Sequence, residues 1–259
     1  MNRNDFPLFL PNSAGDDGGL DKLTTLAANQ TFPLLEDLIN TVGKGKLVNE
    51  IDVSKFCQNE TRKKVSEELD VLFRKHGSDK STTHNYHLIY GHVLANRNIE
   101  SLLEIGLGSN DTNIVSNMGR GGKPGASVLA FKELMPEAEI IGADIDKSIS
   151  VPGIEVFYVD QTDSNSFEKL AKEGRNSYDV IIDDGLHSPN ANLAVLNFGL
   201  RRLTPEGVII IEDIRKEAVP VWRVVAEIIS PQYISALVKT SRSYVFICGP
   251  VTSNYLIPN

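Results

Sequence analysis

Short runs of branched apolar residues alternate along the chain with longer segments in which apolar positions recur every three to four residues. Runs of the first kind are typical of strands buried on both faces of a parallel sheet, and the second spacing is typical of helices that cover such a sheet. This pattern predicts strands over residues 101–105, 139–144, 154–159, 178–184 and 207–213. It predicts helices over residues 86–94, 126–135, 164–173, 190–203 and 219–229.

The end of the chain departs from this alternation. Residues 234–239 and 243–248 form two further apolar runs separated only by a turn. This spacing predicts a hairpin, which places one antiparallel strand in an otherwise parallel sheet. The predicted fold is therefore α/β, with a Rossmann-like, doubly wound, mostly parallel seven-stranded sheet over residues 71–259 and a C-terminal antiparallel hairpin.

Residues 1–70 are predicted to form a helical N-terminal extension that serves as a cap or an oligomer contact. Short helices are expected from Asp21 and over residues 32–42. A longer helix is expected over residues 52–75, where apolar positions at helical spacing lie among charged ones.

The first predicted strand ends in a glycine-rich turn. Gly106 and Gly108 are separated by one residue, which lets the backbone turn sharply and lets a ligand approach more closely than a Cβ would permit. The dinucleotide-binding fingerprint has its third glycine at the position of Asp111, so a nicotinamide oxidoreductase is disfavoured.

Each of these strands ends in an acid or a glycine, and the carboxyl ends of strands in an open α/β sheet converge on one crevice. Asp144 stands where such folds accept hydrogen bonds from ribose hydroxyls, and Asp160 with Gln161 follows the next strand, within reach of an adenine edge. Glu104 beside Gly106 suits a positively charged sulfonium, because opposite charges favour each other's ionised forms.

A second subsite is predicted from the last two parallel strands. Asp184, Glu212 and Asp213 offer oxygen ligands to a hard divalent ion such as Mg²⁺. His187 follows Asp184 by three residues on a turn, so its imidazole can face the same point. Asp183 is expected to face the opposite side of the sheet from Asp184, because successive strand residues alternate.

Composition narrows the class of protein. A chain of 259 residues, 41% of them hydrophobic, can bury a full core. Apolar runs stay below the roughly 20 residues that span a bilayer, and the first residues lack a signal-peptide pattern, so we expect a soluble cytoplasmic protein. Cys57 and Cys248 lack metal-ligand spacing, which disfavours disulfide and zinc roles. The formal net charge of -8 disfavours nucleic acid and membrane as partners.

Several motifs resemble those of the class I S-adenosylmethionine-dependent methyltransferases, and in particular the metal-dependent sugar O-methyltransferases of the macrocin and mycinamicin type. The upstream segment HGSDK with the following H and Y, over residues 76–86, is similar to that family as well. The likeness covers roughly residues 76–213, and the family usually has Ser where Leu186 stands. The motifs are LEIGLG (103–108), GADI (142–145), VDQTD (159–163), IDDGLH (182–187) and IIEDI (210–214).

The resemblance implies a mechanism and a set of site residues. A substrate hydroxyl bound to Mg²⁺ loses its proton to His187, the general base, and its oxygen then attacks the methyl group of S-adenosylmethionine. Asp184, Glu212 and Asp213 match the positions that hold Mg²⁺. The residues expected to bind the cofactor are Glu104, Gly106, Gly108, Asp144, Asp160 and Gln161, together with Lys80 and Tyr86 from the upstream segment.

Three functions stay open at this point. The first is O-methylation of a hydroxyl on a sugar or sugar-bearing metabolite, either a polysaccharide precursor or a natural product. The second is methylation of a phosphate or phosphoramidate oxygen of a capsule precursor, for which the same ion would serve. The third is a non-catalytic S-adenosylmethionine-binding protein whose N-terminal segment recruits a partner. The expected partner is a small-molecule or glycan acceptor, and the N-terminal extension is also compatible with a homo-oligomer.

Overall fold

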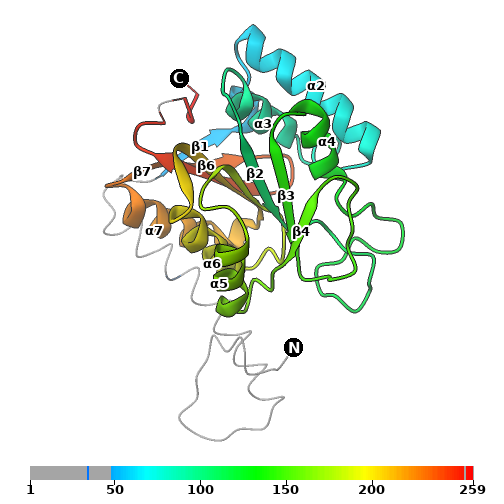
Figure 1. Ribbon diagram of the computed structural model, residues 1–259. Helices are drawn as coiled ribbons and strands as arrows, with labels where there is room; N and C mark the ends of the chain where they lie inside the picture. Colours follow the sequence, from blue (N-terminus) through cyan, green and yellow to red (C-terminus); the bar gives the residue numbers. More distant parts are fainter. Residues whose placement is uncertain (1–33, 35–47, 254, 259) are drawn as a thin grey trace, which may run out of the picture.

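The computed structural model of the chain describes residue 34, residues 48–253 and residues 255–258 (Figure 1). The described strands form one eight-stranded sheet in the order β1-β7-β8-β6-β5-β2-β3-β4. Only β8 runs antiparallel to its neighbours β6 and β7, and all the other paired strands are parallel. The strands are β1 (Asn49–Asp52), β2 (Ser101–Ile105), β3 (Glu139–Asp144), β4 (Glu155–Tyr158), β5 (Tyr178–Asp183), β6 (Leu203–Ile214), β7 (Tyr233–Lys239) and β8 (Tyr244–Pro250).

Helices cover both faces of this sheet (Figure 1). One face is covered by α2 (Glu60–His76), α3 (Tyr86–Leu94) and α4 (Ala126–Leu134), and the other by α5 (Ser164–Glu173), α6 (Pro189–Leu200) and α7 (Val219–Ile229). Two short 3-10 helices, η2 (Val53–Lys55) and η3 (Lys216–Ala218), lie between these elements.

The central strands read as continuous apolar runs because both of their faces are buried. Leu102 packs into the core on the side of α2, α3 and α4, whereas its neighbours Leu103 and Ile105 pack into the core on the other side. In β5, Ile181 and Ile182 divide between the two cores in the same way. This period of two confirms the doubly wound arrangement predicted from the sequence.

The predicted strand count of seven is wrong, because a further edge strand lies outside the alternating pattern. β1 pairs in parallel with β7, and it precedes the helix expected over residues 52–75, which it overlaps only at Asp52. Four residues, two of them charged, carry too little apolar signal for this prediction. The helix itself begins only at Glu60, where the side chain of Asn59 accepts a hydrogen bond from the backbone N–H of Arg62, and it ends before Gly77.

The predicted boundary at residue 70 falls inside α2, a helix whose buried residues belong to the core on the α3 and α4 side. The helices predicted from Asp21 and over residues 32–42 lie outside the described residues, apart from Leu34, which is helical. The role predicted for the N-terminal extension therefore stays a prediction.

A second correction concerns the start of β6. The segment 204–207 was expected to form a turn after a helix that reached Leu203, but it is extended and belongs to β6. Leu203 pairs with Tyr178, and the register shifts before Val180. Pro205 lies at this irregularity, which is where a central strand tolerates proline.

The chain reverses its direction of travel across the sheet at β2, which lies between β5 and β3. Ligands of open α/β sheets bind at the carboxyl ends of the strands beside such a reversal. Gly106 follows β2 there with a φ of 95°, and a Cβ on it would collide with the backbone of Asp184 and Gly185. The turn after β2 therefore packs directly on the turn after β5.

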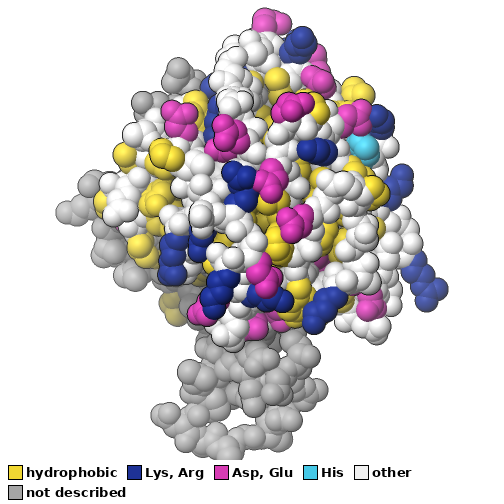
Figure 2. Space-filling view, viewed as in Figure 1, with side chains coloured by type: hydrophobic (Ala, Val, Ile, Leu, Met, Phe, Trp, Pro, Cys, Tyr) yellow, Lys and Arg dark blue, Asp and Glu magenta, His cyan; other side chains and the backbone are white. Residues whose placement is uncertain are grey.

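Acidic and basic side chains are intermixed over the face of the molecule shown in Figure 2. None of the helices in the described part of the chain combines the length and the apolar character needed to cross a bilayer. The exclusion of nucleic acid and membrane as partners stays a prediction.

Candidate functional site

Two adjoining pockets lie at the carboxyl edge of the sheet. The first has a volume of about 250 Å³ and the second about 170 Å³. Both are lined by Gly106, Gly108, Ser116 and Asp184, so one elongated ligand can pass from one pocket into the other. The two glycines have φ values of 95° and 81°, a conformation that non-glycine residues rarely adopt.

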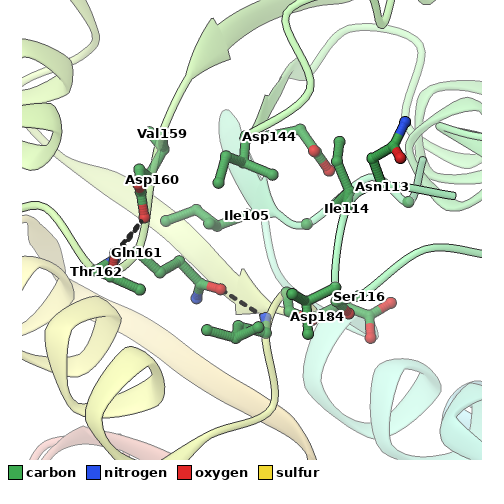
Figure 3. Close-up of a pocket in the computed structure, with 16 residues that line it drawn as sticks. Ile105, Asn113, Ile114, Ser116, Asp144, Val159, Asp160, Gln161, Thr162 and Asp184 are labelled. Atoms are coloured by element: carbon green, nitrogen blue, oxygen red, sulfur yellow. Dashed lines mark hydrogen bonds between the residues drawn. The ribbon is translucent and has the colours of Figure 1, made fainter. Parts of the chain in front are cut away.

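The first pocket has mostly apolar walls, with carboxylates from the ends of β3 and β4 (Figure 3). Asp144 is held at the end of β3 because its two oxygens accept hydrogen bonds from the backbone N–H groups of Leu107 (2.7 Å) and Asp146 (2.8 Å). Burial raises the pKa of Asp144, and these backbone hydrogen bonds oppose that effect. Asp160 is oriented by Thr162, whose N–H and hydroxyl both donate to its Oδ1.

Gln161 lies in the wall of the first pocket, but its amide is turned toward the loop after β5 (Figure 3). Its Oε1 accepts the backbone N–H of Leu186 at 2.7 Å, and its Nε2 donates to Asp183 Oδ1 at 2.7 Å. Both ends of the amide are therefore occupied. The structure brings Gln161 to the expected pocket without leaving its amide free for the predicted contact with adenine.

A buried lysine holds the carboxylates of three strand ends together. Lys80 Nζ lies 2.7 Å from Asp184 Oδ2 and 3.2 Å from Glu104 Oε1, and it also donates to Glu212. An ammonium has three N–H donors, so these three acceptors satisfy it. Burial alone lowers the pKa of Lys80, but the charges of Asp184, Glu212 and Glu104 outweigh it and raise the pKa well above its usual value.

Lys80 was predicted to contact the cofactor. It lines the second pocket, but its ammonium is bound to protein carboxylates. The structure therefore places it beneath the pocket as a counter-ion.

The carboxylates around Lys80 have further partners from helices. Glu212 accepts a hydrogen bond from the hydroxyl of Tyr90, and the hydroxyl of Ser127 lies 2.8 Å from each oxygen of Glu104. Burial raises the pKa of both Glu104 and Glu212, and the charge of Lys80 opposes that rise. Both oxygens of Glu212 are engaged inside the protein, so the structure does not support its predicted role as a metal ligand.

Asp184, His187 and Asp213 do converge, with one potential ligand atom of each lying within 4.8 Å of the others. His187 Nε2 is 3.9 Å from Asp184 Oδ1, and this oxygen is not the one that faces Lys80. His187 and Asp213 adopt left-handed backbone conformations, with φ values of 56° and 53°. Asp213 therefore departs from the regular strand alternation and faces the pocket.

Asp213 is oriented by groups from the segment that precedes β2 and from the turn between β7 and β8. Its Oδ1 accepts hydrogen bonds from the hydroxyls of Tyr86 (2.7 Å) and Ser243 (3.0 Å), and His84 Nδ1 lies 3.3 Å away. Burial raises the pKa of Asp213, but the hydrogen bond from Tyr86 and the charges of His84 and His187 outweigh it and leave the pKa below its usual value. Tyr86 thus supports Asp213, and its contact with the cofactor stays a prediction.

This donor set fits a divalent cation. The carboxylates of Asp184 and Asp213 are hard ligands, and one oxygen of each lies within 4.8 Å of an imidazole nitrogen of His187. A Mg²⁺ ion needs only one or two carboxylates from a protein because it keeps several of its waters. Burial and the fixed hydrogen bonds of both carboxylates supply the orientation that such a site requires.

The sequence analysis assigned no role to Tyr90, Ser127 or His84. For Tyr90 a signal was present, since it follows Tyr86 by four residues on one helix and therefore shares its face. His84 belongs to the upstream motif, but its partner Asp213 is distant in the sequence. Ser127 carried no signal, because its partner Glu104 comes from another segment.

Known proteins that resemble the chain in sequence or fold include methyltransferases. No protein-family model matches the chain. The chain is 28% identical over 156 residues to the 8-demethyl-8-alpha-L-rhamnosyl tetracenomycin-C 2'-O-methyltransferase of Streptomyces olivaceus, and the match covers 59% of this chain and 39% of that protein.

Among solved structures, the chain is similar to the MycE methyltransferase from the mycinamycin biosynthetic pathway in complex with Mg and SAH. The TM-score is 0.57 at 20% identity, over 71% of this chain and 54% of that one. A MycE complex with Mg, SAH and mycinamycin VI matches with the same TM-score at 19% identity. The chain thus spans 39% of the curated relative and about half of MycE, and the structural likeness shows that the two proteins share a fold.

Proposed function

We propose that this chain, which has the Rossmann-like fold of the class I methyltransferases, is an S-adenosylmethionine-dependent and Mg²⁺-dependent O-methyltransferase. Its acceptor is a hydroxyl of a sugar or sugar-bearing metabolite. The observation that carries the proposal is the convergence of Asp184, His187 and Asp213 on the second of two joined pockets. The similarity to a rhamnosyl 2'-O-methyltransferase supports a glycoside as the acceptor.

The two pockets divide the cofactor between them. The first takes the adenosine, with Asp144 at the end of β3 positioned for the ribose hydroxyls. The second takes the methionyl part, because Gly106 and Gly108 line both pockets and so join the second to the first. The methyl group then lies near Asp184, which lines both pockets.

The chain's own residues supply binding, orientation and a base. Asp184 and Asp213 would hold the divalent ion, which when bound lowers the pKa of an acceptor hydroxyl. His187 takes the hydroxyl proton on its imidazole as the general base. Lys80 holds Asp184 from the opposite side, and Tyr86 holds Asp213, so both carboxylates keep their direction. Much of the rate enhancement then comes from alignment of the acceptor oxygen with the methyl group.

The test combines binding with turnover in the full chain. Calorimetry with S-adenosylhomocysteine measures cofactor affinity with Mg²⁺ and with excess EDTA. Mass spectrometry then follows the gain of one methyl group on a panel of rhamnosyl and other deoxyhexosyl glycosides, with sugar phosphates as the competing acceptors. We expect the cofactor product to bind under both conditions and methyl transfer to occur only with the ion.

Each other outcome contradicts the proposal or supports one of its alternatives. Methyl transfer that persists undiminished after chelation contradicts the role of the ion. Transfer to sugar phosphates alone supports methylation of a phosphate oxygen. Cofactor binding without transfer to any acceptor of the panel supports a non-catalytic binding protein.

A further inference from the structure

The loop that carries Asp184 and His187 rests on a buried polar network outside the ion-binding group. Gln161, Asp183 and Asn192 are 8%, 0% and 2% exposed. Gln161 Nε2 donates to one oxygen of Asp183 at 2.7 Å, and Asn192 Nδ2 donates to the other at 2.8 Å. The network thus joins the segment after β4, the end of β5 and helix α6.

The side chains of this network pair with one another and with the backbone through hydrogen bonds. Each oxygen of Asp183 accepts one side-chain amide, and the N–H of Gly185 adds a weaker contact at 3.3 Å. Gln161 uses its remaining oxygen to accept the N–H of Leu186. A buried carboxylate with complete partners specifies one arrangement, because any rearrangement leaves a charged group unpaired in the interior.

The loop needs such support because its backbone is strained. His187 has a φ of 56°, and a non-glycine residue in the left-handed region costs roughly 1–2 kcal/mol. Each of the three preceding residues is tied to another element. Asp184 N–H donates to Ile105 (2.8 Å), Gly185 accepts from the hydroxyl of Ser116 (2.7 Å), and Leu186 N–H donates to Gln161.

The packing beside Gln161 is tight enough to define the loop. A Cβ on Gly185 would collide with Gln161 Oε1, so the loop passes directly over this amide (Figure 3). Asp183 and Asp184 face opposite sides of the sheet, as expected, since one contacts α6 and the other contacts Lys80. The side chain of Asp183, beneath the loop, therefore fixes the direction of the side chain of Asp184 above it.

We propose that Gln161, Asp183 and Asn192 are positioning residues that hold His187 toward the ion-binding carboxylates. The proposal rests on the proposed function, in which His187 is the base. It replaces the adenine contact predicted for Gln161 with support of the catalytic loop. Asn192 is the sharper probe, because it contacts the same carboxylate without lining either pocket.

The experiment compares Asn192→Leu with Asn197→Leu, the same substitution at an exposed position of the same helix. We expect Asn192→Leu to lower kcat by roughly 10–100-fold, the usual effect of removing an outer-shell partner, while the affinity for S-adenosylhomocysteine stays close to that of the unmodified chain. Asn197→Leu should change neither quantity. Gln161→Met should reproduce the fall in kcat, and Asn192→Ala removes the same donor if the leucine variant does not fold.

A double-mutant cycle separates positioning from a general structural role. In a His187→Ala background, Asn192→Leu should cause no further loss of kcat, because the group that it positions is already absent. A full additional loss in that background overturns the proposal. An equal fall in cofactor affinity and kcat also overturns it, since the network would then serve the cofactor pocket.

Histidine NMR provides a readout that does not need turnover. With labelled histidine, the signal lost in His187→Ala identifies His187, and it should shift or broaden in Asn192→Leu. The signal of His92, which is buried against the backbone oxygen of Tyr255, should stay unchanged. If the unmodified chain transfers no methyl group, the proposed function fails while this measurement still tests the loop. An unchanged His187 signal in Asn192→Leu overturns the positioning role.

Discussion

The two halves of the sheet's carboxyl edge build their pockets in different ways, one from apolar walls and the other from charged side chains. The half formed by β2, β3 and β4 makes the larger pocket from apolar walls, with Asp144 held by backbone N–H groups. The half formed by β5 and β6 gathers charges, with Lys80 beneath and Asp184, His187 and Asp213 above. Shape and a few fixed polar groups suffice to bind a large ligand, whereas handling of charge at a reacting atom requires preorganised charges.

The same contrast recurs between two neighbouring residues. The side chain of Glu212 is 1% exposed and contacts Lys80 and Tyr90, whereas that of Asp213 is 26% exposed and faces the second pocket. A lone buried carboxylate is unfavourable, so the first requires an internal cation. The second can receive an external cation because it lies at the pocket. In the proposed function, the adjacent acids of one motif thus serve stability and chemistry separately.

The largest effect, on turnover, is expected from His187→Ala. This substitution disrupts only the half of the edge formed by β5 and β6. Loss of a general base lowers turnover by about 10²–10⁴-fold. The affinity for S-adenosylhomocysteine should stay near that of the unmodified chain, because His187 lies in the second pocket. Steady-state kinetics and calorimetry measure the two quantities, and equal turnover in the variant would refute the assignment of His187 as the base.

Lys80→Met removes the internal cation and should cause a large loss of stability. Breaking a buried ion pair from one side typically costs about 3–5 kcal/mol, because the partner carboxylates stay buried without a counter-charge. The control is Lys75→Met, whose ion pair with Glu133 is exposed and should contribute at most about 1 kcal/mol. Urea unfolding gives both free energies of unfolding, and similar values for the two variants would contradict the role of Lys80.

The deficit of Lys80→Met should depend on pH in a defined direction. Burial raises the pKa of Glu104 and Glu212, and loss of the opposing Lys80 charge raises both pKa values further. An acid whose pKa is higher in the folded state takes up a proton on folding, so its ionisation destabilises the fold as the pH rises through that pKa. The difference in free energy of unfolding between Lys80→Met and the unmodified chain should therefore shrink from about pH 8 to about pH 5. A difference that grows on acidification would contradict this assignment.

A comparison of Asp213→Ala with Glu212→Gln sharpens the division between the two neighbours. Asp213→Ala should weaken divalent-ion binding by at least the roughly 10–100-fold that follows from loss of an outer-shell partner. Glu212→Gln should lower the free energy of unfolding by more than it lowers ion affinity. Manganese titration followed by electron paramagnetic resonance gives the ion affinity. If Glu212→Gln weakens ion binding as strongly as Asp213→Ala, the ligand set predicted from the sequence is restored.

The smallest effect is expected in the adenosine half. Asp144→Ala should weaken S-adenosylhomocysteine binding by roughly 1–3 kcal/mol, the usual value for hydrogen bonds to a charged group or for an unpaired partner. The ion affinity of the variant should remain unchanged, because Asp144 is absent from the ion-binding group. A parallel loss of ion affinity would show that the two halves are coupled.

Much of this architecture followed from local patterns. Helices α3, α5 and α7 have the bounds predicted from the sequence, because their apolar spacing and flanking breaks are clear. β1 escaped prediction because it is an edge strand of four residues. The start of β6 escaped it because Thr-Pro-Glu-Gly has the composition of a turn, whereas its flanking residues Leu203 and Val208 pair with β5.

The sequence by itself determined that acids stand at the ends of buried parallel strands, and therefore that they share one edge of a sheet. It could not determine which acids are paired internally, because Lys80 reaches Asp184 across 104 positions and Glu212 across 132. Only the tertiary structure decided that Lys80 donates to Glu212 and that Tyr86 donates to Asp213. It also decided that the amide of Gln161 turns away from its pocket. These choices depend on the direction of each side chain in a packed interior, where a buried charge or amide must find its partner.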